Sequence, residues 1–228
     1  MIPNYQIRLQ ARDKLRGNWG NAVIVSLIFY GILTAVGWIT EDSFFSVINF
    51  LIMTPLSYGL SLLFLTLIRK NDFNIELLFG GFSEKYLKIV GIGFFTSLFI
   101  FLWSLLLIIP GIVASYSYSM VYFILVDEPD IDIFEAIAKS KKMMYGNKGQ
   151  LFLLDLSFLG WCLLSLLSFG IGFLWLFPYV TTSHTLFYER IKKGSGYEGN
   201  SNYKNETNND REETELKLEK GEQIIHKL

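Results

Sequence analysis

Residues 89–126 read IVGIGFFTSLFIFLWSLLLIIPGIVASYSYSMVYFILV, a run of 38 residues without a charged side chain. A helix rises about 1.5 Å per residue, so this run as one helix would measure about 57 Å, nearly twice the ~30 Å core of a bilayer. Pro110 and Gly111 interrupt the run near its middle. The stretch therefore predicts two membrane-spanning helices, about 89–109 and 111–126, joined at a Pro110-Gly111 turn.

Three other stretches carry the same signature. Residues 19–40 and 43–68 lack charge, and each is long enough for one spanning helix. Residues 150–188 contain a single acid, Asp155, and a glycine-containing break at 168–172, which divides them into two further spans. The predicted fold class is an all-α membrane protein whose six transmembrane helices form three hairpins. The spans lie at about 19–40, 44–68, 89–109, 111–126, 150–168 and 171–189.

The composition of the chain also indicates a membrane protein. Hydrophobic residues make up 51% and charged residues only 18%, compared with ~25% charged in a soluble domain. This balance excludes a soluble enzyme. One cysteine, Cys162, and two histidines exclude a disulfide framework and the common zinc spacings, so we expect no metal and no cofactor. The net charge of -1 gives no indication of nucleic-acid binding.

The positions of the basic residues predict the orientation. In the six-span topology all 20 Lys and Arg fall on one side, and the three outer turns carry none. They are Arg8, Arg12, Lys14 and Arg16 before the first span; Arg69, Lys70, Lys85 and Lys88 after the second; Lys139, Lys141, Lys142 and Lys148 after the fourth; and eight after the sixth. Because cytoplasmic loops are enriched in Lys and Arg, both termini are predicted to be cytoplasmic, in a bacterial cell membrane.

The chain divides into two parts by composition. Residues 1–193 form the six-span membrane domain. Residues 194–228 are rich in Gly, Ser and Asn and then in charge, with 8 acidic and 5 basic residues. We predict that residues 194–228 are a disordered, charged cytoplasmic tail.

Each hairpin is preceded by a segment that predicts a cytoplasmic amphipathic helix. The first carries Arg8, Arg12 and Arg16 on one stripe, and the third runs from a capping Asp132 to Gly146. The middle one is predicted at 83–88. Because even-numbered spans also carry Pro55, Pro110 and Pro178, the three hairpins resemble a threefold repeat. The alternative is that Pro and Gly simply mark helix ends, as they commonly do.

A small set of polar residues falls inside the spans. Asp155 lies five residues after Gln150, and His184 five residues before Glu189, so the two reach similar depths on antiparallel helices and are able to pair. Ser115, Ser119 and Tyr122 share one face of the fourth span with Gly111. These residues form either a polar site lining a substrate path or, as we favour, a packing seam of small residues.

The remaining chemistry of the sequence is sparse. Asp127, Glu128, Asp130 and Asp132 form an acidic cluster that either attracts a cation or, more simply, caps the next helix. Neither a phosphate-binding loop nor a nucleophile with a base and an orienting group is recognisable. We therefore expect that the protein is not an enzyme.

Several segments resemble the bacterial integral-membrane family catalogued as domain of unknown function 975. They are the run from Phe99 to Pro129, Ser140 to Met144, Gly146-Asn147-Lys148, Leu156 to Trp161, Gly17-Asn18-Trp19, and Pro178 to Tyr188. The resemblance covers about residues 5–190 and implies a multi-pass membrane protein. It implies no reaction and no site residues.

Three functions fit these observations. We favour a non-enzymatic membrane component that binds membrane lipids and other membrane proteins, with its basic helices on the anionic inner leaflet. The first alternative is a transporter or permease component with a polar path lined by spans four to six. The second is a self-protection protein against a membrane-active toxin. The oligomeric state does not follow from the sequence.

Overall fold

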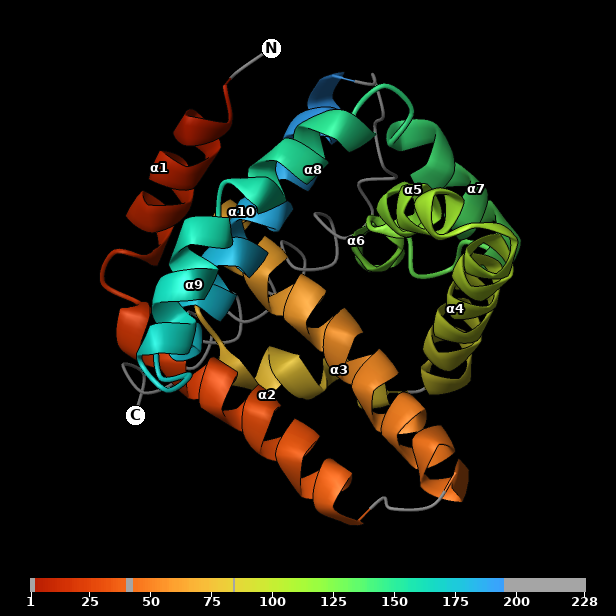
Figure 1. Cartoon of the computed structure of the whole chain (residues 1–228), viewed down its shortest axis with the longest axis horizontal. Helices are drawn as coiled ribbons and strands as arrows, with labels where there is room; N and C mark the ends of the chain where they lie inside the picture. Colours follow the sequence, from red (N-terminus) through yellow and green to blue (C-terminus); the bar gives the residue numbers. More distant parts are fainter. Residues whose placement is uncertain (1–2, 40–42, 84, 195–228) are drawn as a thin grey trace, which may run out of the picture.

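The computed structural model describes residues 3–39, 43–83 and 85–194, and these ranges contain helices and no strand (Figure 1). The prediction of an all-α chain is confirmed. In chain order the helices are α1 (Asn4–Leu15), α2 (Trp19–Ile39), α3 (Ser43–Lys70), the 3-10 helix η1 (Ile75–Phe82), α4 (Tyr86–Leu106), α5 (Ile108–Tyr118), α6 (Val121–Asp127), α7 (Ile133–Met143), α8 (Lys148–Leu156), α9 (Leu159–Leu167) and α10 (Phe173–Gly194).

Four helical segments of the described chain are long and apolar enough to cross a membrane. They are Val47–Lys70 in α3, Tyr86–Leu106 in α4, Ile108–Asp127 in α5 and α6, and Lys148–Leu167 in α8 and α9. A fifth is obtained if α1 and the described part of α2 count as one span, although they meet at a bend of 98°. Several apolar helices are thus present, while six spans in three hairpins remain a prediction.

The turn between the third and fourth predicted spans lies earlier than expected. Leu107 is the break, with an extended backbone (φ -161°, ψ 148°) between α4 and α5. Pro110 is in the first turn of α5, where its missing N–H costs no helical hydrogen bond. Gly111 allows α4 and α5 to approach, because a Cβ there would lie 2.1 Å from Ser104 Oγ. The two residues thus help to start α5 and pack it on α4 rather than form the turn.

Two of the predicted spans are interrupted, at Ser119–Met120 between α5 and α6 and at Ser157–Phe158 between α8 and α9. Neighbouring helices bind the backbone at both breaks. Ser140 Oγ of α7 donates to the Ser117 carbonyl at 2.9 Å and lies 3.3 Å from the Met120 N–H. Arg8 of α1 donates to the Ser157 carbonyl at 3.2 Å. Freed backbone groups at membrane depth are tolerated when such partners satisfy them.

The middle amphipathic helix predicted at 83–88 is absent, because residues 86–88 are the start of α4. The segment before α4 is instead η1, which folds back along α3. Two glycines permit the contact: a Cβ on Gly59 would lie 1.8 Å from the Leu78 carbonyl oxygen, and one on Gly81 would lie 2.2 Å from that of Pro55. Local periodicity did not reveal this packing between η1 and α3.

The first and third amphipathic helices are α1 and α7. Asp132 caps α7 by accepting a hydrogen bond from the Phe134 N–H at 2.9 Å, as predicted. Both helices are followed by a glycine in the left-handed region, Gly17 (φ 87°) and Gly146 (φ 78°), which ends the helix at little steric cost. The matching ends of α1 and α7 are consistent with a repeat of these two units.

Helix α3 crosses the centre of the molecule, with α4, α5 and α7 on one side and α1, α8 and α9 on the other (Figure 1). One apolar core surrounds α6 and includes Val121, Ile124 and Tyr188. A second joins α2, α3 and η1 around Leu63 and Phe64. Helix α10 reaches both cores, so its polar residues lie between the two halves of the molecule.

Candidate functional site

Asp155 and His184 meet in the structure. Asp155 lies in the last turn of α8, and His184 Nε2 of α10 is 2.5 Å from Asp155 Oδ1. The Tyr116 hydroxyl of α5 donates to Asp155 Oδ2 at 3.0 Å. The His184 and Asp155 side chains remain 30% and 31% exposed. Three helices therefore converge on one partly exposed carboxylate, in an arrangement that can share or relay a proton.

The other residues of the predicted polar site lie elsewhere. Ser115 is exposed on α5, and the Ser119 hydroxyl donates to the carbonyl of Tyr116 at 2.9 Å. Tyr122 lies beside Thr54 of α3 and Gly93 of α4. The structure thus brings together Asp155 and His184, but it does not gather Ser115, Ser119 and Tyr122 around them.

The serine and threonine hydroxyl groups of α10 are occupied within their own helix. Each donates to the carbonyl four residues earlier, at 2.7–2.9 Å: Thr181 to Phe177, Thr182 to Pro178, Ser183 to Tyr179 and Thr185 to Thr181. Thr182, Ser183 and Thr185 are completely buried. These contacts support the packing interpretation of the hydroxyl-rich face, because the hydroxyl protons do not point into an open path.

Asp127 at the end of α6 is the centre of an ionic cluster that sequence reasoning missed. Its carboxylate binds Arg69 of α3 at 2.6 and 3.1 Å, Lys192 of α10 at 2.6 Å, and the Tyr188 hydroxyl at 2.6 Å. Arg69 also binds Glu189 at 2.7 Å through Nε. The Asp127 side chain is only 5% exposed. The cluster ties together the C-terminal parts of α3, α6 and α10.

The four acids of the predicted acidic cluster diverge. Glu128 binds Lys139 at 2.6 Å, Asp130 binds Lys85 at 2.7 Å, and Asp132 caps α7. The hydrogen bond and the charge of Lys85 lower the pKa of the exposed Asp130. No group of three potential metal ligands occurs in the described part of the chain. The predicted capping role holds for Asp132, whereas Asp127, Glu128 and Asp130 form ion pairs.

Helix α1 places a row of cations on the surface. Its buried side consists of Ile7, Ala11 and Leu15, which are at most 2% exposed. Arg12 and Arg16 are exposed. Within residues 3–39, 43–83 and 85–194, none of the four cations of α1 and its C-cap forms an ion pair, whereas Arg69, Lys85, Lys139 and Lys192 all do.

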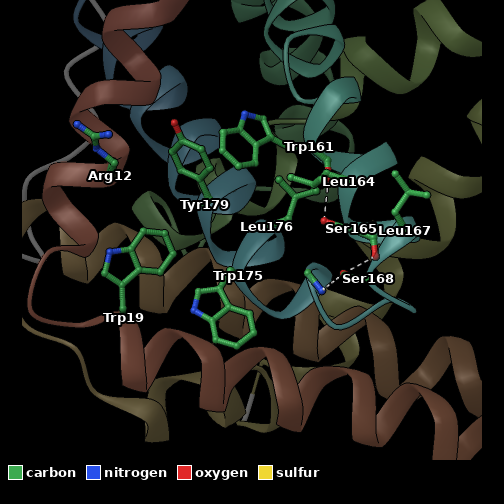
Figure 2. A pocket seen from close by; sticks show the side chains of 11 residues that line it. Arg12, Trp19, Trp161, Leu164, Ser165, Leu167, Ser168, Trp175, Leu176 and Tyr179 are labelled. Atoms are coloured by element: carbon green, nitrogen blue, oxygen red, sulfur yellow. Dashed lines mark hydrogen bonds between the residues drawn. The ribbon is translucent and has the colours of Figure 1, made fainter.

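A groove of about 650 Å³ opens beside this basic helix, between the α1–α2 junction and the helices α9 and α10. Arg12 and Trp19 lie at one end and Leu164 and Leu167 at the other, with further aromatic rings between them (Figure 2). A volume in the ~300–1,000 Å³ range is typical of sites for small ligands. The groove had no signal in the sequence, since its walls come from distant segments.

The sequence model of one protein family matches the chain in two overlapping segments, residues 1–117 and 104–195. The family is described as "Protein of unknown function (DUF975)". No curated protein and no solved structure matches the chain. The match extends over all the helices from α1 to α10, and its description assigns them no activity.

Proposed function

The chain belongs to the DUF975 family of proteins of unknown function, and we propose that it is a multi-pass, non-enzymatic membrane protein that binds anionic lipids and other membrane proteins. Its six spans form three hairpins with both termini in the cytoplasm of a bacterial cell. The basic surface of α1 carries this proposal. Arg12, Lys14 and Arg16 form no ion pair within the described chain, so they are available to the negatively charged inner leaflet, whereas Arg8 is bound to the Ser157 carbonyl.

The exposed apolar surface supports immersion in lipid. At the α4–α5 connection, Leu105, Ile108 and Ile109 are 74%, 77% and 74% exposed. In α9 and the turn that follows, Leu167 is 79% and Phe169 is 98% exposed. Contiguous apolar surfaces of this kind are rare on soluble monomers and mark contact with a membrane or a partner.

The ionic cluster around Asp127 supports the orientation. It unites the C-terminal parts of α3, α6 and α10, which correspond to the second, fourth and sixth predicted spans. Helix ends joined by direct ion pairs lie on the same side of a membrane. The cations of these ends are the ones that the distribution of Lys and Arg assigns to the cytoplasm.

The lipid preference of the purified protein tests the proposal. Full-length protein extracted from membranes is analysed for bound lipid, and a variant with Arg12, Lys14 and Arg16 changed to Gln is compared with it. We expect the wild type to be enriched in anionic lipid and the variant to lose the enrichment, because each cation near an anionic surface contributes about 1 kcal/mol. The control is Lys85→Gln, which should keep the enrichment in anionic lipid because Lys85 is already paired with Asp130. Equal lipid profiles for wild type and triple variant would overturn the proposal.

The contact between Asp155 and His184 favours transport as a second candidate function. A carboxylate, an imidazole and the Tyr116 hydroxyl within hydrogen-bonding distance are able to pass a proton between them. Proteoliposomes with a pH-sensitive dye inside would then show protein-dependent proton flux that D155N abolishes. Flux that is the same with D155N, or absent in the wild type, argues against transport through this pair.

A further inference from the structure

The groove beside α1 has a polar end and an apolar end. At the polar end Arg12 of α1 lies near Trp19 and Tyr179, whose rings are 6.5 Å apart (Figure 2). At the other end Leu164 and Leu167 of α9 line the wall. Among the residues that the structure describes, Arg12 is the only charged one in the lining, so a ligand there meets one positive charge without an ion-pair partner and a long hydrophobic surface.

Two serines of the wall do not add polarity. Ser165 Oγ donates to the Trp161 carbonyl at 2.8 Å, and Ser168 Oγ donates to the Ser165 carbonyl at 2.8 Å and accepts from the Gly172 N–H at 3.0 Å (Figure 2). Because these hydroxyl groups are occupied by the backbone, the wall around them is effectively apolar. A ligand that fits this wall has an alkyl chain in the part of the groove that Arg12 does not reach.

The aromatic residues of the groove suit an amphipathic ligand. Trp19, Trp161, Trp175 and Tyr179 all line it. Such rings combine an apolar face with a polar edge, so they can contact both the alkyl chain and the polar group of a lipid. Arginine is also suited to phosphate, because its planar guanidinium donates two parallel hydrogen bonds.

We propose that the groove holds one anionic phospholipid, with its phosphate at Arg12 and an acyl chain along Trp161, Leu164 and Leu167. This site rests on the proposed lipid-binding function and makes it specific. The general attraction of α1 acts on the whole leaflet, whereas the groove selects a single molecule. The groove favours an anionic phospholipid because it combines one positive charge with an apolar volume of about 650 Å³.

Tryptophan quenching by brominated lipid tests the site. The full chain with Trp38 and Trp103 changed to Phe retains the three tryptophans of the groove. It is reconstituted in phosphatidylcholine vesicles that contain the same small fraction of either brominated phosphatidylglycerol or brominated phosphatidylcholine. We expect stronger quenching by the anionic lipid. R12Q should weaken its apparent affinity about fivefold, the effect of one cation near an anionic lipid, and R12K should preserve it.

The matched control is K85Q, which removes an exposed cation that is paired with Asp130 and does not line the groove. We expect K85Q to retain the preference for the brominated anionic lipid. Equal losses in R12Q and K85Q would overturn the groove while leaving a general effect of positive charge on lipid binding. Preferential quenching by a brominated free fatty acid would overturn the assignment to a phospholipid. If the wild type also carries no excess of anionic lipid, the proposed function itself fails.

Discussion

Arg69 holds Asp127 with both terminal nitrogens of its guanidinium group, at 2.6 Å and 3.1 Å. The two residues are far apart in the sequence, yet their contact joins the end of α3 to the end of α6. Lys192 and Tyr188 of α10 bind the same carboxylate. A single buried acid thus fixes the mutual position of three helices, and breaking such a cluster on one side leaves uncompensated charges.

We predict that D127N destabilises the protein by about 3 kcal/mol, the lower end for breaking a buried ion pair, because the buried Asp127 carboxylate is lost while Arg69 keeps its contact with Glu189. Thermal unfolding in one fixed detergent measures the effect. The matched control is D130N: Asp130 also binds a lysine, but its side chain is 93% exposed, so we expect little change in melting temperature. Similar melting temperatures for D127N and the wild type would show that the cluster adds nothing to stability.

Gly59 and Gly81 are predicted to be irreplaceable by alanine. A methyl group at either position would overlap a backbone carbonyl between α3 and η1, and overpacking of this kind costs about 1–3 kcal/mol or more. The melting temperatures of G59A and G81A should fall well below that of G149A, since Gly149 has open space around its Cβ position. If all three variants melt alike, η1 does not pack on α3 as described.

Asp155 and His184 should be coupled energetically. In a double-mutant cycle of D155N and H184Q we expect a coupling of about 0.5–1.5 kcal/mol, the lower part of the range for contacting residues, because both side chains are about a third exposed. Chemical or thermal unfolding of the four proteins supplies the values. A second cycle of H184Q with D132N provides the control, since Asp132 caps α7 and does not contact His184. Purely additive effects of D155N and H184Q would contradict the pair.

The six-span topology predicts the location of reporter domains fused along the chain. Fusions after Lys70, Lys148 and Lys193 should report the cytoplasm, and one after Asp42 should report the outside. Each position adjoins a charged loop or turn in the sequence. An outside signal at Lys193 would eliminate an even number of spans and the orientation proposed for α10.

Some features of the structure are local enough to be predicted from the sequence. Asp132 begins α7, and Gly146 follows it in the left-handed conformation, because capping and glycine's conformational freedom depend on neighbouring residues only. The Asp155–His184 contact joins distant segments, yet residue counting predicts it. Both residues lie five positions from the end of their predicted spans, and the two spans are antiparallel, so the side chains reach the same depth.

Other features depend on packing between distant segments and carry no local signal. The 3-10 helix η1 forms where Gly59 and Gly81 admit close contact with α3, and neither glycine stands out in the sequence. Ser115 and Ser119 share one face in the sequence, yet α5 ends at Tyr118, so this face does not continue to Tyr122 in α6. The ion pairs of Asp127 carry no local signal because its partners Arg69 and Lys192 lie far away in the sequence, in α3 and α10.

The position of Asp127 between Arg69 and α10 has a consequence for how the chain is assembled. During synthesis Arg69 and Asp127 emerge well before Tyr188 and Lys192. In a partly synthesised chain the Asp127 carboxylate therefore has Arg69 as a partner but not yet the two donors of α10. Arrival of α10 adds the remaining donors and joins the two apolar cores. Completion of the fold is thereby tied to the arrival of its last described helix, because a chain interrupted before that point holds the Asp127 carboxylate without its contacts to Tyr188 and Lys192.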